Sequence, residues 1–106
     1  MITFEEFKKV ELKIATIKEV VEHSNADKLY VVKVDVGGVE KQVVAGIRPF
    51  YAKEALIGKQ VILVDNLAPV MLRGIESQGM ILAAKDEAGF TVLTVDKKVK
   101  EGTLVT

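Results

Sequence analysis

Short runs of alternating apolar and polar residues, separated by turn residues, constrain the fold of this chain more than any other feature. In residues 10–14 every second side chain is apolar, which predicts a β-strand. The alternation changes phase after Ala15, so that Ile17 and Val21 become apolar positions. A phase change within one strand predicts a bulge or a sharp bend. A long, bent first strand that serves two sheets is typical of small closed barrels.

Four further strands are predicted at residues 29–36, 41–46, 60–65 and 79–85. In the first of them, alternate residues from Tyr30 to Val36 place apolar side chains on one face. Gly37 and Gly38 mark a hairpin turn, and residues 48–58 form an insertion with a helical centre. Five strands with an insertion between the third and fourth predict an all-β, five-stranded Greek-key OB-fold barrel.

The first residues of the chain, 3–9, predict a short N-terminal helix. Thr3 and Glu6 have the spacing of a capping box. Phe4 and Phe7 lie on one side of this helix, and we expect them to plug one end of the core.

The C-terminal part of the chain holds more strand than a five-stranded barrel requires. A turn at residues 86–89 leads to an extended segment at 90–95. A charged stretch at 96–101 then precedes a last apolar piece, Leu104-Val105. We expect these extra C-terminal strand pieces to cap the barrel or to pair with another chain.

Length and composition limit the class of protein. The 106 residues suffice for a single domain, residues 1–106. The chain has no cysteine, which excludes disulfides and thiolate metal sites and favours a cytoplasmic location. No segment is apolar over a length that spans a membrane, so we expect no membrane partner. Fifteen basic and fifteen acidic residues cancel, so nucleic-acid binding would depend on local arrangement and shape.

The residues required for catalysis are not found in a catalytic pattern. The single histidine, His23, lies in a predicted turn, and there is no cysteine to pair with it. His23 and Asp27 have a spacing that two metal ligands could share, but a solvated turn with a local hydrogen bond is the favoured interpretation. No glycine-rich phosphate loop occurs. We therefore expect no enzyme activity and no cofactor.

The stretch 66–84 combines hydrogen-bonding side chains, one fixed cation and an apolar methionine with Pro69 and two glycines. Such a loop is typical of a recognition surface presented by a β scaffold. In OB folds the loop between strands four and five lies beside the loop between strands one and two. We therefore predict that one nucleic-acid-binding surface gathers these six residues: Lys28, Asn66, Arg73, Ser77, Gln78 and Met80.

Each type of side chain suits one part of a nucleic acid. Lys28 and Arg73 can bind phosphates. The two amides and the serine can hydrogen-bond sugar or base edges, and Met80 can pack against a sugar or base.

Simpler interpretations stay open for single residues. Lys28 could be a solvated turn lysine, and Arg73 could pair with Glu76 of the same loop. Asn66 could hydrogen-bond backbone at a strand end, and Met80 could belong to the core.

Five motifs occur in a characteristic order: residues 25–29 (Asn-Ala-Asp-Lys-Leu), 42–47 (Gln-Val-Val-Ala-Gly-Ile), Tyr51 with 56–59 (Leu-Ile-Gly-Lys), 66–69 (Asn-Leu-Ala-Pro) and 74–84 (Gly-Ile-Glu-Ser-Gln-Gly-Met-Ile-Leu-Ala-Ala). Together they closely resemble the tRNA-binding domain family. That family includes the C-terminal module of methionyl-tRNA synthetases, free-standing structure-specific tRNA-binding proteins and EMAP-II-like domains. The resemblance covers essentially the whole chain.

The resemblance implies a non-catalytic OB-fold homodimer that binds tRNA by its L shape, near the outer corner, without reading the anticodon. The matched positions Lys28, Ser77 and Met80 would contact tRNA, with Asn66 and Arg73 as looser candidates. The first helix and the tail after Phe90 would help form the dimer interface. If the chain is an appendage, the catalytic part of methionyl-tRNA synthetase is a further partner.

The chain departs from the family pattern in one loop. Relatives often carry basic residues where this chain has Ala68, Val70 and Met71, which leaves an apolar loop tip. An apolar tip suits the alternative function of a sister group, the CsaA chaperones, which use a similar dimeric barrel to bind extended peptides.

Overall fold

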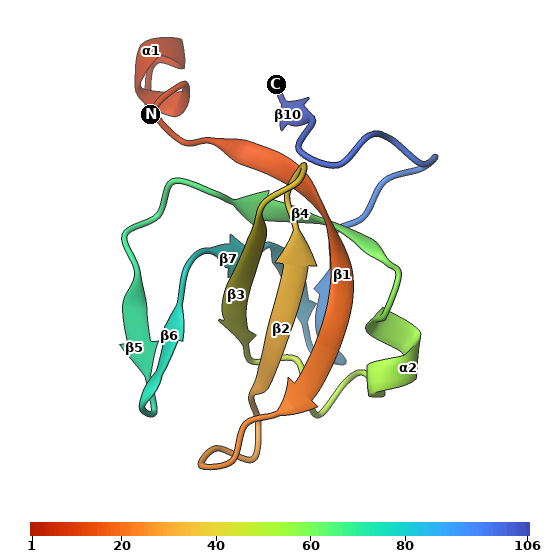
Figure 1. Cartoon of the computed structure of the whole chain (residues 1–106). Coiled ribbons are helices and arrows are strands. Elements are labelled where there is room, and N and C mark those ends of the chain that lie inside the picture. Colours follow the sequence, from red (N-terminus) through yellow and green to blue (C-terminus); the bar gives the residue numbers. More distant parts are fainter.

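A nearly closed barrel of antiparallel strands forms the centre of the molecule in the computed structural model, which describes residues 1–106 (Figure 1). The strand order is β3-β2-β1-β4-β7. These strands are β1 (Leu12–Glu22), β2 (Tyr30–Asp35), β3 (Glu40–Ala45), β4 (Gln60–Val64) and β7 (Met80–Ile81). The predicted all-β, five-stranded OB-type barrel is confirmed.

Strand β1 serves both sides of the barrel because it is long and bulged. Its first half pairs with β4 and its second half with β2, and both pairings include Thr16. The register with β2 shifts between Ile17 and Glu19, so the predicted change of phase is confirmed as a bulge. After the bulge Val20 enters the core, whereas Val21 is exposed.

The barrel interior is built from β-branched side chains with few large ones. Ile17, Val32, Val43 and Leu63 are fully buried at its centre. Tyr30 brings the main polar group into this interior, and its hydroxyl donates a hydrogen bond of 2.6 Å to the carbonyl of Tyr51. The predicted apolar face of residues 30–36 is confirmed, because its alternate residues all lie in this core.

Between β4 and β7 the chain forms a hairpin that the sequence did not predict. It consists of β5 (Val70–Leu72) and β6 (Ile75–Ser77), joined by a two-residue turn. Both turn residues have positive φ, 54° at Arg73 and 91° at Gly74, as a tight hairpin turn requires. The supposed loop is therefore a β-ribbon that stands beside the barrel (Figure 1).

The strand predicted at residues 79–85 is two separate pieces. Strand β7 ends at Ile81, and β8 (Ala83–Asp86) pairs with β9 (Gly89–Val92) in a hairpin of its own. Leu82 lies at the break, where its N–H donates to the carbonyl of Ile62 and its carbonyl accepts from Leu93. The chain thus pairs with β4 up to Leu82 and with β9 and the residue after it from Leu82 onward, and this change of partner divides the predicted strand.

The two chain ends lie beside each other, above one end of the barrel (Figure 1). Helix α1 (Phe4–Phe7) has the predicted capping box, and β10 (Leu104–Val105) pairs with the start of β1. The prediction that Phe4 and Phe7 plug the core is wrong, because they are 70% and 40% exposed. The linker between α1 and β1 holds the helix off the barrel.

The second helix, α2 (Lys53–Leu56), fills the predicted insertion between β3 and β4 and buries Leu56 in the core. Neither helix has the length and apolar character needed to cross a membrane.

Candidate nucleic-acid interface

The loop between β1 and β2, residues 23–29, is fastened to the tip of the β5–β6 hairpin. His23 is buried, and its Nε2 lies 3.0 Å from the carbonyl oxygen of Leu72. Its Nδ1 accepts a hydrogen bond of 2.9 Å from the N–H of Asn25. A carbonyl can only accept and an N–H can only donate, so Nε2 carries the proton. The ring therefore joins two segments 49 residues apart in the sequence.

Arg73 makes the second connection between these segments. Its Nε and Nη2 donate to the carbonyl of Asn25 at 3.2 and 3.0 Å. A guanidinium has five N–H groups, so the rest of this one stays available to a ligand. The alternative pairing of Arg73 with Glu76 is not formed. Residues 23–29 and 72–74 are named the loop cluster from here on.

Lys28 belongs to the loop cluster and is exposed. It takes part in none of the ion pairs of the molecule. The loop that carries it is braced on its other side, because Arg48 donates to the carbonyl of Ala26 at 3.2 Å. Arg73 is thus bonded to the loop that carries Lys28, and this loop is held on both sides.

Ser77 lies at the other end of the hairpin, its base, and is only 2% exposed. Its hydroxyl accepts from the N–H of Val44 in β3 at 2.9 Å and donates to the carbonyl of Gly79 at 3.0 Å. The prediction of an accessible serine is therefore corrected. The barrel leaves β3 without a regular partner on this side, and the serine hydroxyl supplies the missing acceptor.

Gln78 continues this seam between β3 and the hairpin base. Its N–H donates to the carbonyl of Gln42, and its Oε1 accepts from the N–H of Gln42, both at 2.8 Å. The Gln42 amide in turn donates to the carbonyl of Glu76. Ser77 and Gln78 together close the barrel where strand pairing ends.

Met80 and the hairpin present apolar side chains to solvent. Met80 is 47% exposed, so the alternative that it belongs to the core is wrong. Ile81, the next residue of β7, packs against the core and leaves Met80 on the outer face. Val70 and Met71 are also half or more exposed, but they do not form an apolar tip: Val70 pairs with Ser77 at the hairpin base, and Arg73-Gly74 forms the tip.

Asn66 is not part of the loop cluster. Its Nδ2 donates to the carbonyl of Lys9 at 2.7 Å, and its Oδ1 accepts from the N–H of Glu11 at 2.9 Å. These partners lie at the start of β1, whereas the loop cluster follows its end. An eleven-residue strand separates the two by roughly 30 Å. The interpretation of Asn66 as a backbone-binding residue fits this geometry.

Two further lysines are held by an internal ion cluster. The carboxylate of Asp65 lies 2.9 Å from Nζ of Lys13 and 2.6 Å from Nζ of Lys41. Burial raises the pKa of Asp65, but the hydrogen bonds and charges of Lys41 and Lys13 outweigh burial and keep this pKa below its ordinary value. The hydrogen bond to Asp65 also raises the pKa of Lys13. These cations stabilise the barrel end and are not free to bind phosphate.

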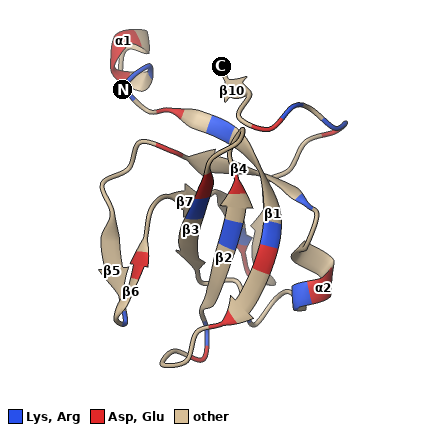
Figure 2. Ribbon diagram, viewed as in Figure 1, with Lys and Arg blue, Asp and Glu red and all other residues tan.

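Sequence reasoning missed the part played by His23, which was interpreted as a solvated turn residue. Its partner Leu72 lies in a segment that was not predicted to be a hairpin, so no local signal was present. Figure 2 shows why a charge map also fails to mark the site: basic and acidic residues alternate over β1, β2 and β3, while the hairpin tip carries a single basic residue.

A family model described as "Putative tRNA binding domain" matches residues 12–104. The chain belongs to the tRNA-binding domain family. The matched segment contains the whole barrel, the β5–β6 hairpin and both parts of the loop cluster. The prediction made from the five motifs is therefore confirmed at the level of the family.

Curated relatives of this chain include methionine–tRNA ligases. The methionine–tRNA ligase of Pyrococcus furiosus is 52% identical over 104 residues, and that of Nanoarchaeum equitans is 43% identical over 105 residues. These alignments cover 98% and 99% of this chain but 14% of each ligase. The chain thus spans about one seventh of the length of these curated relatives.

Solved structures extend the comparison to chains of similar length. The MetRS-related protein of Pyrococcus horikoshii superposes with a TM-score of 0.93 at 34% identity, covering 100% of this chain and 98% of that one. The CsaA chaperone of Picrophilus torridus also superposes with a TM-score of 0.93, at 31% identity and complete coverage of both chains. The fold alone therefore does not separate the MetRS-related protein from the CsaA chaperone.

Proposed function

We propose that this chain is a non-catalytic, structure-specific tRNA-binding module that recognises the L shape of tRNA near its elbow. One observation carries the proposal: the contacts of His23 and Arg73 join two connectors into one surface that holds Lys28. This surface is the edge that OB folds use for polynucleotides. The family match and the methionine–tRNA ligase relatives support RNA as the ligand.

Recognition of shape follows from how little charge the surface offers. Two cations neutralise few phosphates, so bulk attraction to any nucleic acid is weak. Arg73 is held by Asn25 and Lys28 sits on a braced loop, so both are positioned before the RNA arrives. Met80 pairs with Val64 near the start of β1 and lies outside the loop cluster, so its apolar contact, which does not depend on base identity, would require an RNA that extends along the hairpin. Ser77 and Gln78 would support RNA binding indirectly, because their hydrogen bonds to β3 position the hairpin. Asn66 would also act indirectly, because it bonds the backbone at the start of β1.

Dimerisation is the second element of the proposal. A four-residue helix with no buried residue is too short to be stable alone. Its exposed phenylalanines border an apolar hollow of about 220 Å³ that Val10 and Leu104 also line. A second copy of this chain seated on the hollow would cover these side chains. It would also place two weak RNA-binding surfaces on one rigid body, which raises the avidity.

Attachment to a synthetase is the third element. The ligase relatives contain this domain as 14% of their length. In such a context the module would hold tRNA for a separate catalytic part and would itself perform no chemistry. A free-standing protein would use the same surface.

Peptide binding is the second candidate function, and one observation favours it. Leu67, Val70, Met71 and Met80 expose 44–61% of their surface around the hairpin. An extended apolar peptide could pack on such a strip. The CsaA chaperone of Picrophilus torridus shares the fold at a TM-score of 0.93.

A titration with unfractionated tRNA, at several salt concentrations, tests the proposal. Fluorescence anisotropy of the complex, in competition with a linear single-stranded RNA and with an apolar peptide, separates the ligand classes. We expect tRNA to bind with a modest salt dependence and the linear strand to compete poorly. Binding of the peptide without binding of tRNA would establish the chaperone function instead.

A further inference from the structure

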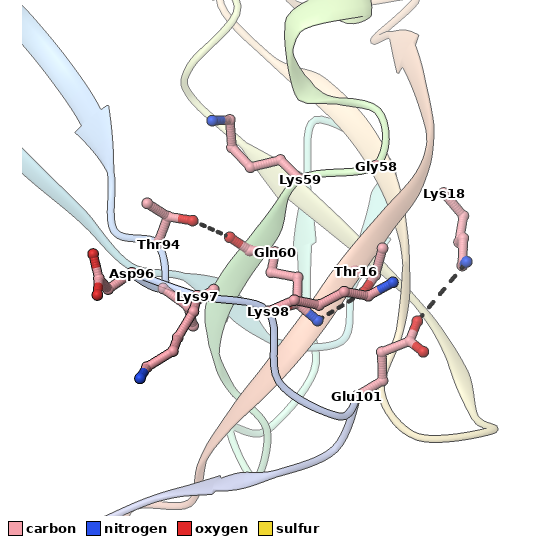
Figure 3. Close-up of a pocket in the computed structure, with 11 residues that line it drawn as sticks. Thr16, Lys18, Gly58, Lys59, Gln60, Thr94, Asp96, Lys97, Lys98 and Glu101 are labelled. Carbon is pink, nitrogen blue, oxygen red and sulfur yellow. Dashed lines mark hydrogen bonds and ion pairs between the residues drawn. The ribbon is translucent and has the colours of Figure 1, made fainter.

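A polar hollow of about 420 Å³ lies between β1, the start of β4 and the tail, which is defined here as residues 93–103 (Figure 3). Thr16 and Gln60 form its floor, and four lysines border it: Lys18, Lys59, Lys97 and Lys98. Val95 is its only apolar lining residue. None of its residues belongs to the loop cluster, so this is a separate surface. It is named the tail hollow.

Gln60 supplies the side-chain hydrogen bonds that hold the centre of the tail, while Gly102 and Thr103 bond the backbone of Ile14 further along. The Gln60 amide donates to the carbonyl of Val99 at 2.8 Å and accepts from the N–H of Val99 at 3.1 Å. Thr94 donates to the Gln60 carbonyl at 2.7 Å. The polar groups of the floor are thus already bonded, and the groups left for a ligand are the ammonium groups at the rim. Figure 3 shows Lys59 and Lys97 pointing outward from this contact.

Unpaired positive charge is concentrated here. Six of the fifteen Lys and Arg side chains form ion pairs, which leaves nine unpaired. Three of these nine line the tail hollow: Lys59, Lys97 and Lys98. Only two lie in the loop cluster. Of the acidic groups at the hollow, Glu101 pairs with Lys18 at 3.8 Å, which leaves Asp96 unpaired.

We propose that the tail hollow is a second contact surface for the phosphate backbone of the tRNA bound at the loop cluster. The inference rests on the proposed function and extends it. Lysines on a fixed rim bind phosphodiesters as point charges without reading bases. Two surfaces on different sides of the barrel can be reached together by a bent, folded RNA, whereas a short linear strand reaches one. The tail hollow thereby supplies a preference for folded RNA that two cations cannot supply alone.

The test removes three unpaired lysines of the hollow together, in K59Q/K97Q/K98Q. The control, K33Q/K53Q/K85Q, removes the same charge from lysines outside the tail hollow, the loop cluster and the apolar hollow at α1. Affinity for tRNA is measured by anisotropy from 50 to 300 mM salt. We expect the hollow variant to bind tRNA roughly tenfold more weakly at low salt, with a log–log salt slope that is smaller by about 2. The control should retain most of the affinity. Equal weakening of both variants would overturn the inference.

A second variant, which removes a negative charge from the hollow, keeps the inference testable if the triple variant does not fold. D96N removes the unpaired negative charge of the hollow, so tRNA affinity should rise by about twofold. An unchanged or lower affinity would contradict the inference. An octanucleotide should bind the wild type and K59Q/K97Q/K98Q alike, since it can occupy the loop cluster alone.

The variant K28Q/R73Q, measured in parallel, separates this inference from the proposed function. If only K28Q/R73Q weakens tRNA binding, the loop cluster is the site and the tail hollow has no part in it. If only the hollow variant weakens binding, the loop cluster proposal is wrong and the RNA binds at the hollow. A wild type that does not bind tRNA overturns both.

Discussion

The two ends of the β5–β6 hairpin contain similar polar residues that do different work. At the base, Ser77 and Gln78 use their hydrogen-bonding groups on β3 and on Gly79, and the serine is buried. At the tip, Arg73 uses only part of its guanidinium on Asn25 and stays exposed. The difference teaches that one hairpin can close the barrel at its base and leave a partly bonded cation exposed at its tip. Substitutions at the base should act on stability, and substitutions at the tip on binding.

Ser77→Ala should have the largest effect on stability, because it removes hydrogen bonds at the hairpin base. It leaves the N–H of Val44 and the carbonyl of Gly79 without their buried partner, so the free energy of unfolding should fall by about 3 kcal/mol. Urea denaturation measures this fall. The exposed Ser24→Ala is the matched control and should stay within about 0.5 kcal/mol of wild type. Unchanged stability in Ser77→Ala would place this serine on the binding surface.

Asp65→Asn tests the same end of the molecule through its charges. The substitution leaves Lys41 without an anionic partner and leaves Lys13 with Glu11 alone at 4.0 Å, so the free energy of unfolding at pH 7 should fall by roughly 2 kcal/mol. Because the pKa of Asp65 is lowered in the folded state, its stabilisation is present above the unfolded pKa of about 3.9 and is lost as pH falls through the folded value. The difference between wild type and variant should therefore shrink below about pH 4. A difference that stayed constant down to pH 2 would contradict the ion cluster.

His23→Ala should loosen the tip without opening the barrel. It removes the connection between Leu72 and Asn25, which is worth about 1–2 kcal/mol. Amide hydrogen exchange should become faster in residues 70–77 and stay slow in β1 and β2. Uniformly faster exchange across the barrel would mean that His23 supports the core instead.

Arg73→Gln should separate binding from stability. The free energy of unfolding should change by less than about 0.5 kcal/mol. The Arg73 side chain is exposed, and its partner, the carbonyl of Asn25, is a neutral group. Affinity for tRNA should fall about fivefold through loss of a phosphate contact. Lys85→Gln is the control, because Lys85 is exposed, forms no ion pair with a carboxylate and lies outside the loop cluster and the tail hollow. An equal loss of binding in Lys85→Gln would mean that Arg73→Gln reports total charge and not a contact at the hairpin tip.

Met80→Ala should have the smallest effect. The side chain is half exposed, so stability should change little and tRNA affinity should fall about twofold. Affinity for an apolar peptide, measured with the same variant, sharpens the choice between the two candidate functions. A tenfold loss of peptide binding with unchanged tRNA binding would favour the chaperone function.

The barrel was predictable because its signals are local. The alternation through Tyr30 to Val36, the glycine pair after it and the phase change after Ala15 each depend on neighbours in the sequence. The β5–β6 hairpin was missed since its strands are only three residues long and its turn, Arg73-Gly74, has no strong signal at the first position. Phe4 and Phe7 were placed wrongly for a different reason. An amphipathic pattern shows that a helix has an apolar face, but it does not show which part of the protein covers that face.

The site was predictable in part for the same reason. That the two connectors meet follows from the barrel topology, so the joining of Lys28 and Arg73 could be foreseen. The burial of Ser77 and the separation of Asn66 depend on hydrogen bonds to Val44 and Glu11, which lie 33 and 55 residues away. No spacing in the sequence encodes these partners. The motif Ser-Gln-Gly-Met therefore looked like one binding unit although its two halves face different environments.

The most direct test of the account is to map the RNA contact on the isotopically labelled chain by amide NMR during a tRNA titration. The account predicts that the largest shift changes lie in residues 24–28, in residues 72–75 and at Met80, with a second set at Lys97 and Lys98. The amides of Val44 and Gly79 at the hairpin base should change little. Shift changes confined to α1 and β10, or no change with tRNA at all, would contradict the central claim that the loop cluster grips a folded RNA.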